Sequence, residues 1–201
     1  MTQCRRVALD VWLGFARCAP ETATLKNERR WAADHEAADR AVATVLAASG
    51  LAWDACATSR SHTHGLAAAV AAPAGVAVGV DLVEVARVGR RHAEAILSGQ
   101  EWRALAQCAA ARPALGWALK EAAAKACGHP SRCFPLGLRI TSDAGGLTVE
   151  ALGSGRPRFT AGWGLLDGFL YAWVRGVADR QGPPLKQRVG ELTHRLEPLG
   201  R

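Results

Sequence analysis

The sequence predicts an α+β fold of two similar halves, each formed by a small, mostly antiparallel sheet packed against a long helix. Residues 25–48 and 117–126 have the composition and spacing of helices. Short apolar runs with strand character lie between and after them. Two of these runs, 65–72 and 168–174, begin at a glycine that follows a polar loop. This repeated order predicts two halves related by pseudo-twofold symmetry.

The N-terminal half opens with an apolar, β-prone run. Residues 7–16 read Val-Ala-Leu-Asp-Val-Trp-Leu-Gly-Phe-Ala, which predicts one opening strand. Apolar residues then recur at helical spacing within 25–48. Gly50 is expected to end this helix, because glycine readily adopts the left-handed conformation found after a helix. The first half therefore supplies one long helix.

A polar segment at 57–65 predicts a loop that leads into a strand at 66–72. The sequence Pro-Ala-Gly at 73–75 predicts a turn, and the run at 76–81 predicts the next strand. We expect these two strands to pair as a hairpin. The turn also marks the expected end of the N-terminal half, residues 1–75.

The C-terminal half, residues 76–180, continues with helices. Residues 92–97 are predicted to be helical. Ser98 is followed three positions later by Glu101, which is the pattern of a capping box at the start of a helix. The next helix is therefore expected to run through 102–110.

Pro113 is expected to separate that helix from the one at 117–126. Asp143 is expected to be a turn residue between two short strands rather than a ligand. The strands predicted in this part of the chain cover residues 136–141, 147–152 and 168–174. Residues 181–201 are expected to form a peripheral tail.

Composition restricts the class of protein and its partners. The 201 residues are 49% hydrophobic and 21% charged, which is typical of a globular chain and not of a disordered one. A formal net charge of +7 favours an acidic partner, such as nucleic acid, a cofactor with phosphates or an acidic protein. Nucleic acid is not expected, because the basic residues are scattered and form no long tract.

Neither a zinc site nor a membrane span is expected. The cysteines show no C-x-x-C pairs, so dispersed reduced thiols are the simplest interpretation. Residues 65–80, the longest apolar run, are too few for a span and include Pro73 and Gly75. The chain opens without a charged-then-apolar leader. We therefore expect a cytoplasmic protein. The six cysteines are Cys4, Cys18, Cys56, Cys108, Cys127 and Cys133.

Two carboxylates in separate elements are candidates for a shared site. Residues four apart lie on one face of a helix, so Trp117, Glu121 and Lys125 form one stripe. The simplest interpretation of Glu121 and Lys125 alone is an exposed ion pair, with Trp117 as a packing anchor. However, Asp81 ends the β-prone run that begins at residue 76, which can place its carboxylate at the rim of a sheet. Asp81 and Glu121 could then meet.

Ser61 and His62 lie in the polar segment before the small-residue strand. Hydroxyl and imidazole groups there suit a ligand that approaches the backbone closely, and histidine can hydrogen-bond a phosphate. A histidine that is merely solvated is the simpler alternative. The pair His62 and His64 also suggests metal binding, but no third ligand lies nearby in the sequence.

These motifs together resemble the 4′-phosphopantetheinyl transferase superfamily, in particular its larger, surfactin-synthetase-activating type. Gly-Val-Asp-Leu-Val-Glu-Val at 79–85 and Trp-Ala-Leu-Lys-Glu-Ala-Ala-Ala-Lys at 117–125 are similar to the two signature motifs, in the expected order. Further similar segments are 96–102, which contains the Ser-x-x-Glu pattern, 135–137, Ser61-His62, and Arg29-Arg30-Trp31 with Arg40 in the first-half basic helix.

The resemblance implies a reaction and its partners. The family transfers the 4′-phosphopantetheine arm of coenzyme A to a serine of an apo acyl or peptidyl carrier protein and releases adenosine 3′,5′-bisphosphate. Magnesium is the expected cofactor, since it neutralises a pyrophosphate and is commonly held by one or two carboxylates. The implied protein is a pseudodimeric monomer with its active site between the halves, and it serves an acidic carrier protein of fatty acid, polyketide or nonribosomal peptide biosynthesis.

The resemblance also implies roles for particular residues. Asp81 and Glu121 would bind Mg²⁺, and Glu121 would accept the serine proton directly or through a metal-bound water. Lys125 would contact the phosphates and stabilise charge in the transition state. Lys120 points about 100° away from that stripe and would contact phosphate from its own side.

The 3′-phosphate end of coenzyme A would be held in the N-terminal half. The residues expected there are Ser61, His62 and Arg40. No clear Gly-Lys-Pro loop precedes Ser61, which is a departure from the family pattern.

The metal motif departs from the surfactin type. That type has its second acidic ligand two residues after the first, where this chain has Val83. Glu84 lies one position further on, as in the small trimeric holo-acyl-carrier-protein synthases. A strand places Asp81 and Val83 on one side and Glu84 on the other, so Glu84 is not a simple replacement. Water is expected to take the place of the missing ligand.

Two alternatives from other classes remain open. A catalytically silent, carrier-binding module of the same fold would keep the basic surface, yet the presence of Asp81, Glu121 and Lys125 together argues against it. A nucleic-acid-binding protein would explain the charge but leaves the two carboxylates unexplained.

Overall fold

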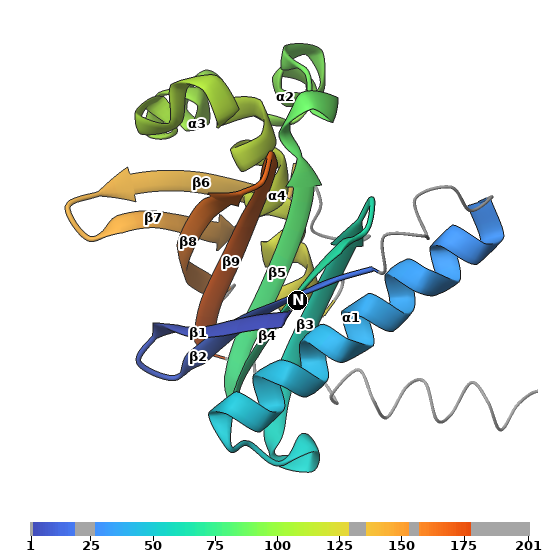
Figure 1. Cartoon of the computed structure of the whole chain (residues 1–201). Coiled ribbons are helices and arrows are strands. Elements are labelled where there is room, and N and C mark those ends of the chain that lie inside the picture. Colours follow the sequence, from blue (N-terminus) through green and yellow to red (C-terminus); the bar gives the residue numbers. More distant parts are fainter. Residues whose placement is uncertain (1, 19–26, 129–135, 153–156, 178–201) are drawn as a thin grey trace, which may run out of the picture.

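The computed structural model describes residues 2–18, 27–128, 136–152 and 157–177. It shows an α+β fold with two antiparallel sheets (Figure 1). The helices are α1 (Asn27–Ser49), α2 (Arg90–Ile96), α3 (Gly99–Ala104) and α4 (Arg112–Ala126), with short 3-10 helices η2 (Trp53–Ala55), η3 (Val85–Arg87) and η4 (Ala106–Ala111). The strands are β1 (Thr2–Ala8), β2 (Val11–Arg17), β3 (Cys56–Thr63), β4 (Leu66–Pro73), β5 (Val76–Glu84), β6 (Leu138–Asp143), β7 (Gly146–Ala151), β8 (Arg158–Leu166) and β9 (Phe169–Val177).

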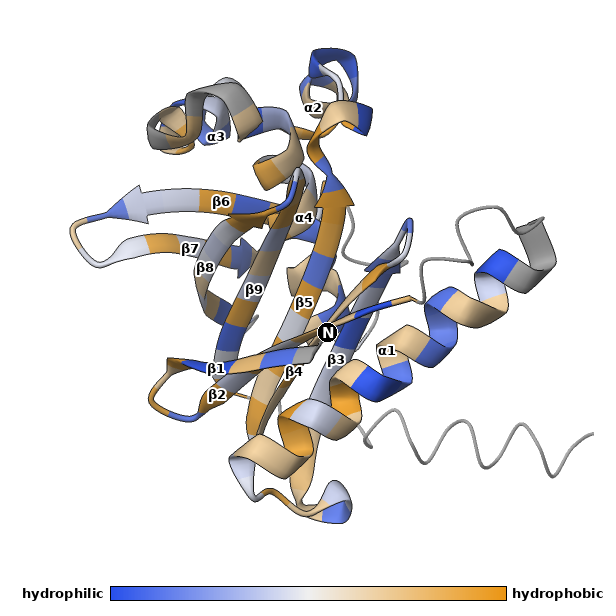
Figure 2. Cartoon of the chain, viewed as in Figure 1, coloured by the Kyte–Doolittle hydropathy of each residue, from blue (hydrophilic) through white to orange (hydrophobic). Residues whose placement is uncertain are grey.

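The first sheet has the strand order β1-β2-β4-β3 and carries α1 on its outer face. Alanines dominate the contact between α1 and β4, and small side chains let a helix lie close to a sheet. In Figure 2, α1 alternates between hydrophilic and hydrophobic residues, as expected of a helix with one buried side. Gly14 on β2 leaves room for Val45 of this helix.

The second sheet has the strand order β5-β9-β8-β7-β6 and packs against α4. Buried residues of α4, β6, β7 and β9 form one core cluster on that side of the sheet. The other face of β5 and β9 meets the inner face of β2 and β4 in a separate cluster. The two sheets therefore pack face to face, with α1 and α4 on the outside.

Several local predictions are confirmed. The helix predicted at 25–48 is α1, and Gly50 follows it with a positive φ of 68°. Ser98 and Glu101 form the expected capping box at the start of α3. Asp143 accepts a hydrogen bond from the backbone of Gly145 in the turn after β6. The helix predicted at 117–126 is present but begins earlier, at Arg112, so Pro113 lies in its first turn, where its missing N–H has no helical acceptor to lose.

Two predictions about strands are wrong, and one strand was not predicted. The run at 7–16 is not one strand, because the chain turns at residues 9 and 10 and β1 pairs with β2. The segment 57–65 is mostly strand β3, whose polar residues reflect its position at the edge of the first sheet. The run 158–166, which carried no prediction, is strand β8.

The predicted hairpin of 66–72 with 76–81 is also wrong. The turn is present, with Gly75 at a φ of 88°, but β4 pairs with β2 and β3 while β5 pairs with β9. The chain passes from the first sheet to the second at this turn. A division at residue 75 and a pseudo-twofold relation between the halves stay predictions. The predicted tail, 181–201, lies outside the described residues.

The helix predicted at 102–110 is only partly present. Helix α3 ends at Ala104, and η4 follows with non-helical backbone angles at Cys108. None of the helices in the described part of the chain combines the length and apolar character needed to cross a bilayer.

Asp10 links the two sheets through a two-pronged ion pair with Arg175. The Arg175 Nε and Nη2 atoms lie 2.5 and 2.7 Å from the two carboxylate oxygens of Asp10. The hydrogen bond from Arg175 lowers the pKa of Asp10. Because the pKa is lower in the folded state, the stabilisation is present above the unfolded-state pKa and is lost as pH falls through the folded-state pKa.

Asp10→Asn should lower the free energy of unfolding by about 1 kcal/mol at neutral pH, a modest value because both side chains are partly exposed. Urea denaturation at neutral and acid pH measures this, and the difference from the parent should shrink in acid. Asp54→Asn, at an exposed position in η2, is the matched control. An equal loss in both variants would contradict the inter-sheet role of Asp10.

Candidate functional site

Gly79 brings α4 unusually close to β5. A Cβ atom at Gly79 would overlap the backbone carbonyl oxygen of Ala122. The glycine therefore allows helix and strand backbones to touch. Glu121 and Lys125 flank this point of contact on α4, and Asp81 is two residues further along β5. Two elements about forty positions apart in the chain thus present their side chains to one place.

Asp81 is the centre of this site. The residue is only 6% exposed, and its Oδ1 atom accepts hydrogen bonds from Lys125 Nζ at 2.7 Å and from Ser61 Oγ at 2.9 Å. Lys125 also donates to the backbone oxygen of Val80 at 3.1 Å. Ser61 comes from β3 of the first sheet. The site therefore lies where the edge strands of both sheets meet α4.

Glu121 faces the same place from α4. It is half-buried, and the structure shows no hydrogen bond to its carboxylate from any described residue. Burial raises the pKa of Glu121, the negative charge of Asp81 raises it further, and Lys125 partly offsets both. The two carboxylates are thus close enough to repel each other, and additional positive charge between them would be favourable.

This donor set fits a divalent cation. Magnesium prefers oxygen ligands and is usually bound by one or two carboxylates, with water and substrate phosphates completing the shell. Asp81 and Glu121 supply such a pair, and their mutual repulsion favours a cation near them. Across the described ranges there is no cluster of three or more His, Cys, Asp or Glu residues able to hold a metal. A metal ion here would therefore be bound by the two carboxylates of Asp81 and Glu121. This agrees with the valine at position 83, where the surfactin type has a further acidic ligand.

Val83 and Glu84 lie on opposite sides of β5. Val83 packs against the core cluster that contains α4, on the same side as Asp81. Glu84 instead lies 2.8 Å from Arg87 Nε and 3.4 Å from His64 Nδ1. The Glu84 carboxylate therefore pairs with Arg87 and His64 and does not face Glu121. This agrees with the expectation that Val83 and Glu84 lie on opposite sides of the strand.

Ser61 and His62 point to different sides of β3. Ser61 contacts Asp81, whereas the centroid of the His62 ring lies 4.5 Å from that of the His35 ring on α1. His35 in turn lies 4.0 Å from the exposed ring of Trp31. Burial lowers the pKa of His62, and the neighbouring His35 lowers it further. His62 is therefore expected to be a neutral hydrogen-bonding group at neutral pH.

Arg40 is directed toward the first sheet. It pairs with Glu36 at 2.7 Å, one turn before it on α1, and donates to the backbone oxygen of Arg17 at 3.1 Å. His62, by contrast, contacts α1 through His35. Ser61 thus faces the second sheet, whereas His62 and Arg40 each make a contact between α1 and the first sheet, and a common role for the three residues stays a prediction.

Lys120 is a correction to the sequence-based expectation. Its side chain is 2% exposed, and its ammonium lies 2.9 Å from Glu101 Oε1 and donates to the backbone oxygen of Ile96 at 2.6 Å. A buried ammonium with these partners is not available to a phosphate. The helical geometry gave the direction of Lys120 correctly, but that direction leads into α2 and α3 instead of a ligand cleft.

Sequence reasoning missed Ser59 and the role of Gly79. The Ser59 hydroxyl accepts a hydrogen bond from the backbone N–H of Val80 at 3.2 Å, which ties β3 to β5 next to Asp81. Ser59 and Ser61 are two apart and so lie on one face of a strand. A strand assignment for 57–65 would have revealed this pair.

One family comparison covers the second sheet and its helix. Residues 77–177, just over half of the chain, match the model of the family described as ACPS, the 4′-phosphopantetheinyl transferase superfamily. The match includes Asp81, Glu121 and Lys125 and leaves out Ser61 and His62. The chain matches none of the curated proteins.

Proposed function

Because the chain belongs to the 4′-phosphopantetheinyl transferase superfamily, we propose that it moves the 4′-phosphopantetheine arm of coenzyme A to a serine of an apo acyl or peptidyl carrier protein. Coenzyme A is the substrate that this family uses. The reaction is magnesium-dependent and releases adenosine 3′,5′-bisphosphate. One observation supports this proposal most directly. Asp81, Glu121 and Lys125 lie together where β3, β5 and α4 come into contact.

Asp81 and Glu121 would hold the magnesium ion. When bound, it supplies positive charge that neutralises the pyrophosphate of coenzyme A and assists departure of the leaving group. Lys125 lies beside Asp81 and its side chain is partly exposed, so it is placed to contact the same phosphates. Ser61 keeps the Asp81 carboxylate in place through its hydroxyl.

Glu121 is the proposed base. The serine oxygen of the carrier protein forms a bond to the phosphorus that bears the pantetheine arm, and its proton goes to the Glu121 carboxylate. The bond from that phosphorus to the bridging oxygen breaks, and adenosine 3′,5′-bisphosphate leaves with that oxygen. In the metal-free site burial and Asp81 raise the pKa of Glu121, and a base works best when its pKa approaches the working pH.

Coenzyme A would bind along β3 and α1, next to Asp81, Glu121 and Lys125. Ser61, His62 and Arg40 are the residues proposed for its 3′-phosphate end. The rings of His62, His35 and Trp31 form a row from β3 to the exposed side of α1, which supports binding of a ligand there. His62 would donate a hydrogen bond without a full charge.

The partner would be an acidic carrier protein. The net charge of +7 supports steering of such a partner toward the enzyme, and salt should then weaken its association. We propose a cytoplasmic, pseudodimeric monomer of the surfactin-synthetase-activating type. The pathway served would be fatty acid, polyketide or nonribosomal peptide biosynthesis.

The test is a mass measurement on the carrier protein. Incubation with coenzyme A, magnesium and each of several apo carrier proteins should add one phosphopantetheine to at least one carrier. Omission of magnesium, with a chelator present, should abolish the mass gain. Binding of carriers without any mass gain would instead support the catalytically silent module, and absence of both would contradict the proposal.

A further inference from the structure

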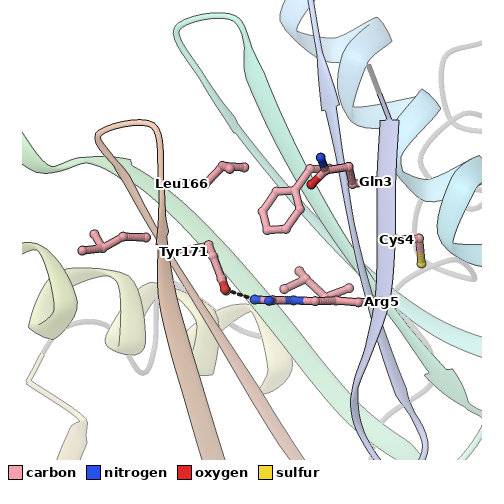
Figure 3. A pocket seen from close by; sticks show the side chains of 8 residues that line it. Gln3, Cys4, Arg5, Leu166 and Tyr171 are labelled. Atoms are coloured by element: carbon pink, nitrogen blue, oxygen red, sulfur yellow. Dashed lines mark hydrogen bonds between the residues drawn. The ribbon is translucent and has the colours of Figure 1, made fainter.

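A pocket of about 340 Å³ lies between the two sheets, away from the site described above (Figure 3). It is bounded by β1 and β2 of the first sheet and by β8 and β9 of the second. Its volume is at the lower end of the range for small-molecule sites. The side chains that define its chemistry are Gln3, Arg5, Leu13, Phe15, Leu166 and Tyr171.

The pocket and the Asp81 site lie on opposite faces of the second sheet. Tyr171 pairs with Leu82, and both side chains belong to the cluster between the sheets. Asp81 pairs with Ala172, and its carboxylate is held by Lys125 of α4 on the other face. A ligand in the pocket would therefore not occupy the position of the proposed reaction.

Four of the eight residues that line the pocket are apolar. Leu13 and Phe15 come from β2, and the Phe15 ring meets the Tyr171 ring edge to face at a centroid distance of 5.0 Å. Leu165, which is 59% exposed, stands with Leu166 on the β8 side of the opening. These surfaces suit an aromatic or aliphatic body of modest size.

Arg5 gives the pocket a positive charge. Its guanidinium donates a hydrogen bond to the Tyr171 hydroxyl and lies 5.3 Å from the centre of that ring. No acidic side chain lines the pocket, and Arg5 has no ion-pair partner among the described residues. Figure 3 shows the Arg5 side chain reaching toward Tyr171 while Cys4 points to the opposite side of β1. The neutral Tyr171 hydroxyl leaves the charge of Arg5 uncompensated.

We propose that this pocket binds a small organic anion with an apolar body, of the arylalkanoate class. The apolar body of the ligand would pack against Leu165, Leu166 and Phe15, and its carboxylate would pair with Arg5. A carboxylate accepts both forked guanidinium hydrogen bonds, which the single tyrosine hydroxyl does not. This site is separate from the proposed transfer reaction and does not depend on it.

The test is titration of the full chain with 4-phenylbutyrate and with its neutral amide, followed by calorimetry. The acid should bind saturably and about fivefold more tightly than the amide, a moderate factor because Arg5 lies at the exposed mouth of the pocket. Arg5→Gln should weaken binding of the acid about fivefold and leave the amide unchanged. The preference for the acid should then disappear.

Arg6→Gln is the matched control. It removes the same charge from the next residue of β1, whose guanidinium instead lies over Trp12 on the other side of the strand. Binding of the acid to this variant should stay within about twofold of the parent. Lack of saturable binding, equal affinity for acid and amide, or equal weakening in both arginine variants would each overturn the proposal.

Discussion

Glu121→Gln should slow phosphopantetheinyl transfer by about 10²- to 10⁴-fold, which is the usual contribution of a positioned general base. Glutamine keeps the shape of the side chain but neither accepts a proton nor supplies a negative ligand. The free energy of unfolding should not decrease in this variant. Burial and Asp81 raise the pKa of Glu121, so the ionised form is disfavoured in the folded state and its removal relieves a cost at neutral pH.

The pH dependence of transfer provides a second readout of Glu121. The reaction needs the ionised carboxylate, so the rate should fall as pH decreases through its pKa. Without metal, burial and Asp81 raise that pKa, and a bound magnesium ion would lower it, so a higher magnesium concentration should move the fall to lower pH. Initial rates measured by mass spectrometry across a pH series check this, and the fall should be absent from the residual activity of Glu121→Gln.

Glu84→Gln is the matched control for Glu121→Gln. It makes the same chemical change nearby, but its carboxylate pairs with Arg87 and His64 instead of facing Asp81. Transfer by this variant should stay within about threefold of the parent, as expected of a partly exposed ion pair. Similar losses in both variants, or full activity of Glu121→Gln, would remove Glu121 from its proposed role.

Glu101→Ala should destabilise the fold by about 3–5 kcal/mol, because it leaves the Lys120 ammonium buried without its partner. Glu101 also accepts backbone hydrogen bonds from Ser98 at 2.8 Å and Ile140 at 3.0 Å. One carboxylate thereby joins α3, α4 and β6. Burial raises the pKa of Glu101, but the hydrogen bonds from Ser98, Lys120 and Ile140 more than offset this and lower it overall.

Urea denaturation measures this loss, and Glu94→Ala serves as its control. Glu94 forms an exposed ion pair with Arg90 on α2, so its removal should cost less than about 0.5 kcal/mol. Since the folded-state pKa of Glu101 is lowered, its stabilisation is present above the unfolded-state pKa and is lost as pH falls through the folded-state pKa. A loss no larger than that of Glu94→Ala would show that the buried pair is not important for stability.

Local sequence signals predicted helices better than strand pairings. The capping box of Ser98 and Glu101 and the end of α1 at Gly50 depend on neighbouring residues, so they can be read directly. Strand partners depend on the whole chain. The apolar runs on either side of Gly75 look like a hairpin, yet each finds its partners in a different sheet.

Polar residues led to wrong predictions where their partners lie elsewhere in the tertiary structure. The hydroxyl-rich segment that contains Ser59 and Ser61 looked like a loop, but it is an edge strand whose hydroxyls contact β5 and Asp81. The resemblance implied a phosphate contact for Lys120, but Glu101 makes its burial possible. In both cases the partner comes from a distant part of the chain.

The sequence by itself determined the α+β class, the positions of the main helices and the stripe that places Glu121 one turn before Lys125. Helical spacing is a property of the chain alone, so the stripe could be predicted. Only the tertiary structure decided that this stripe faces Asp81. That outcome depends on the close approach of α4 to β5 at Gly79 and on Ser61 from the other sheet, and neither contact is encoded by local spacing.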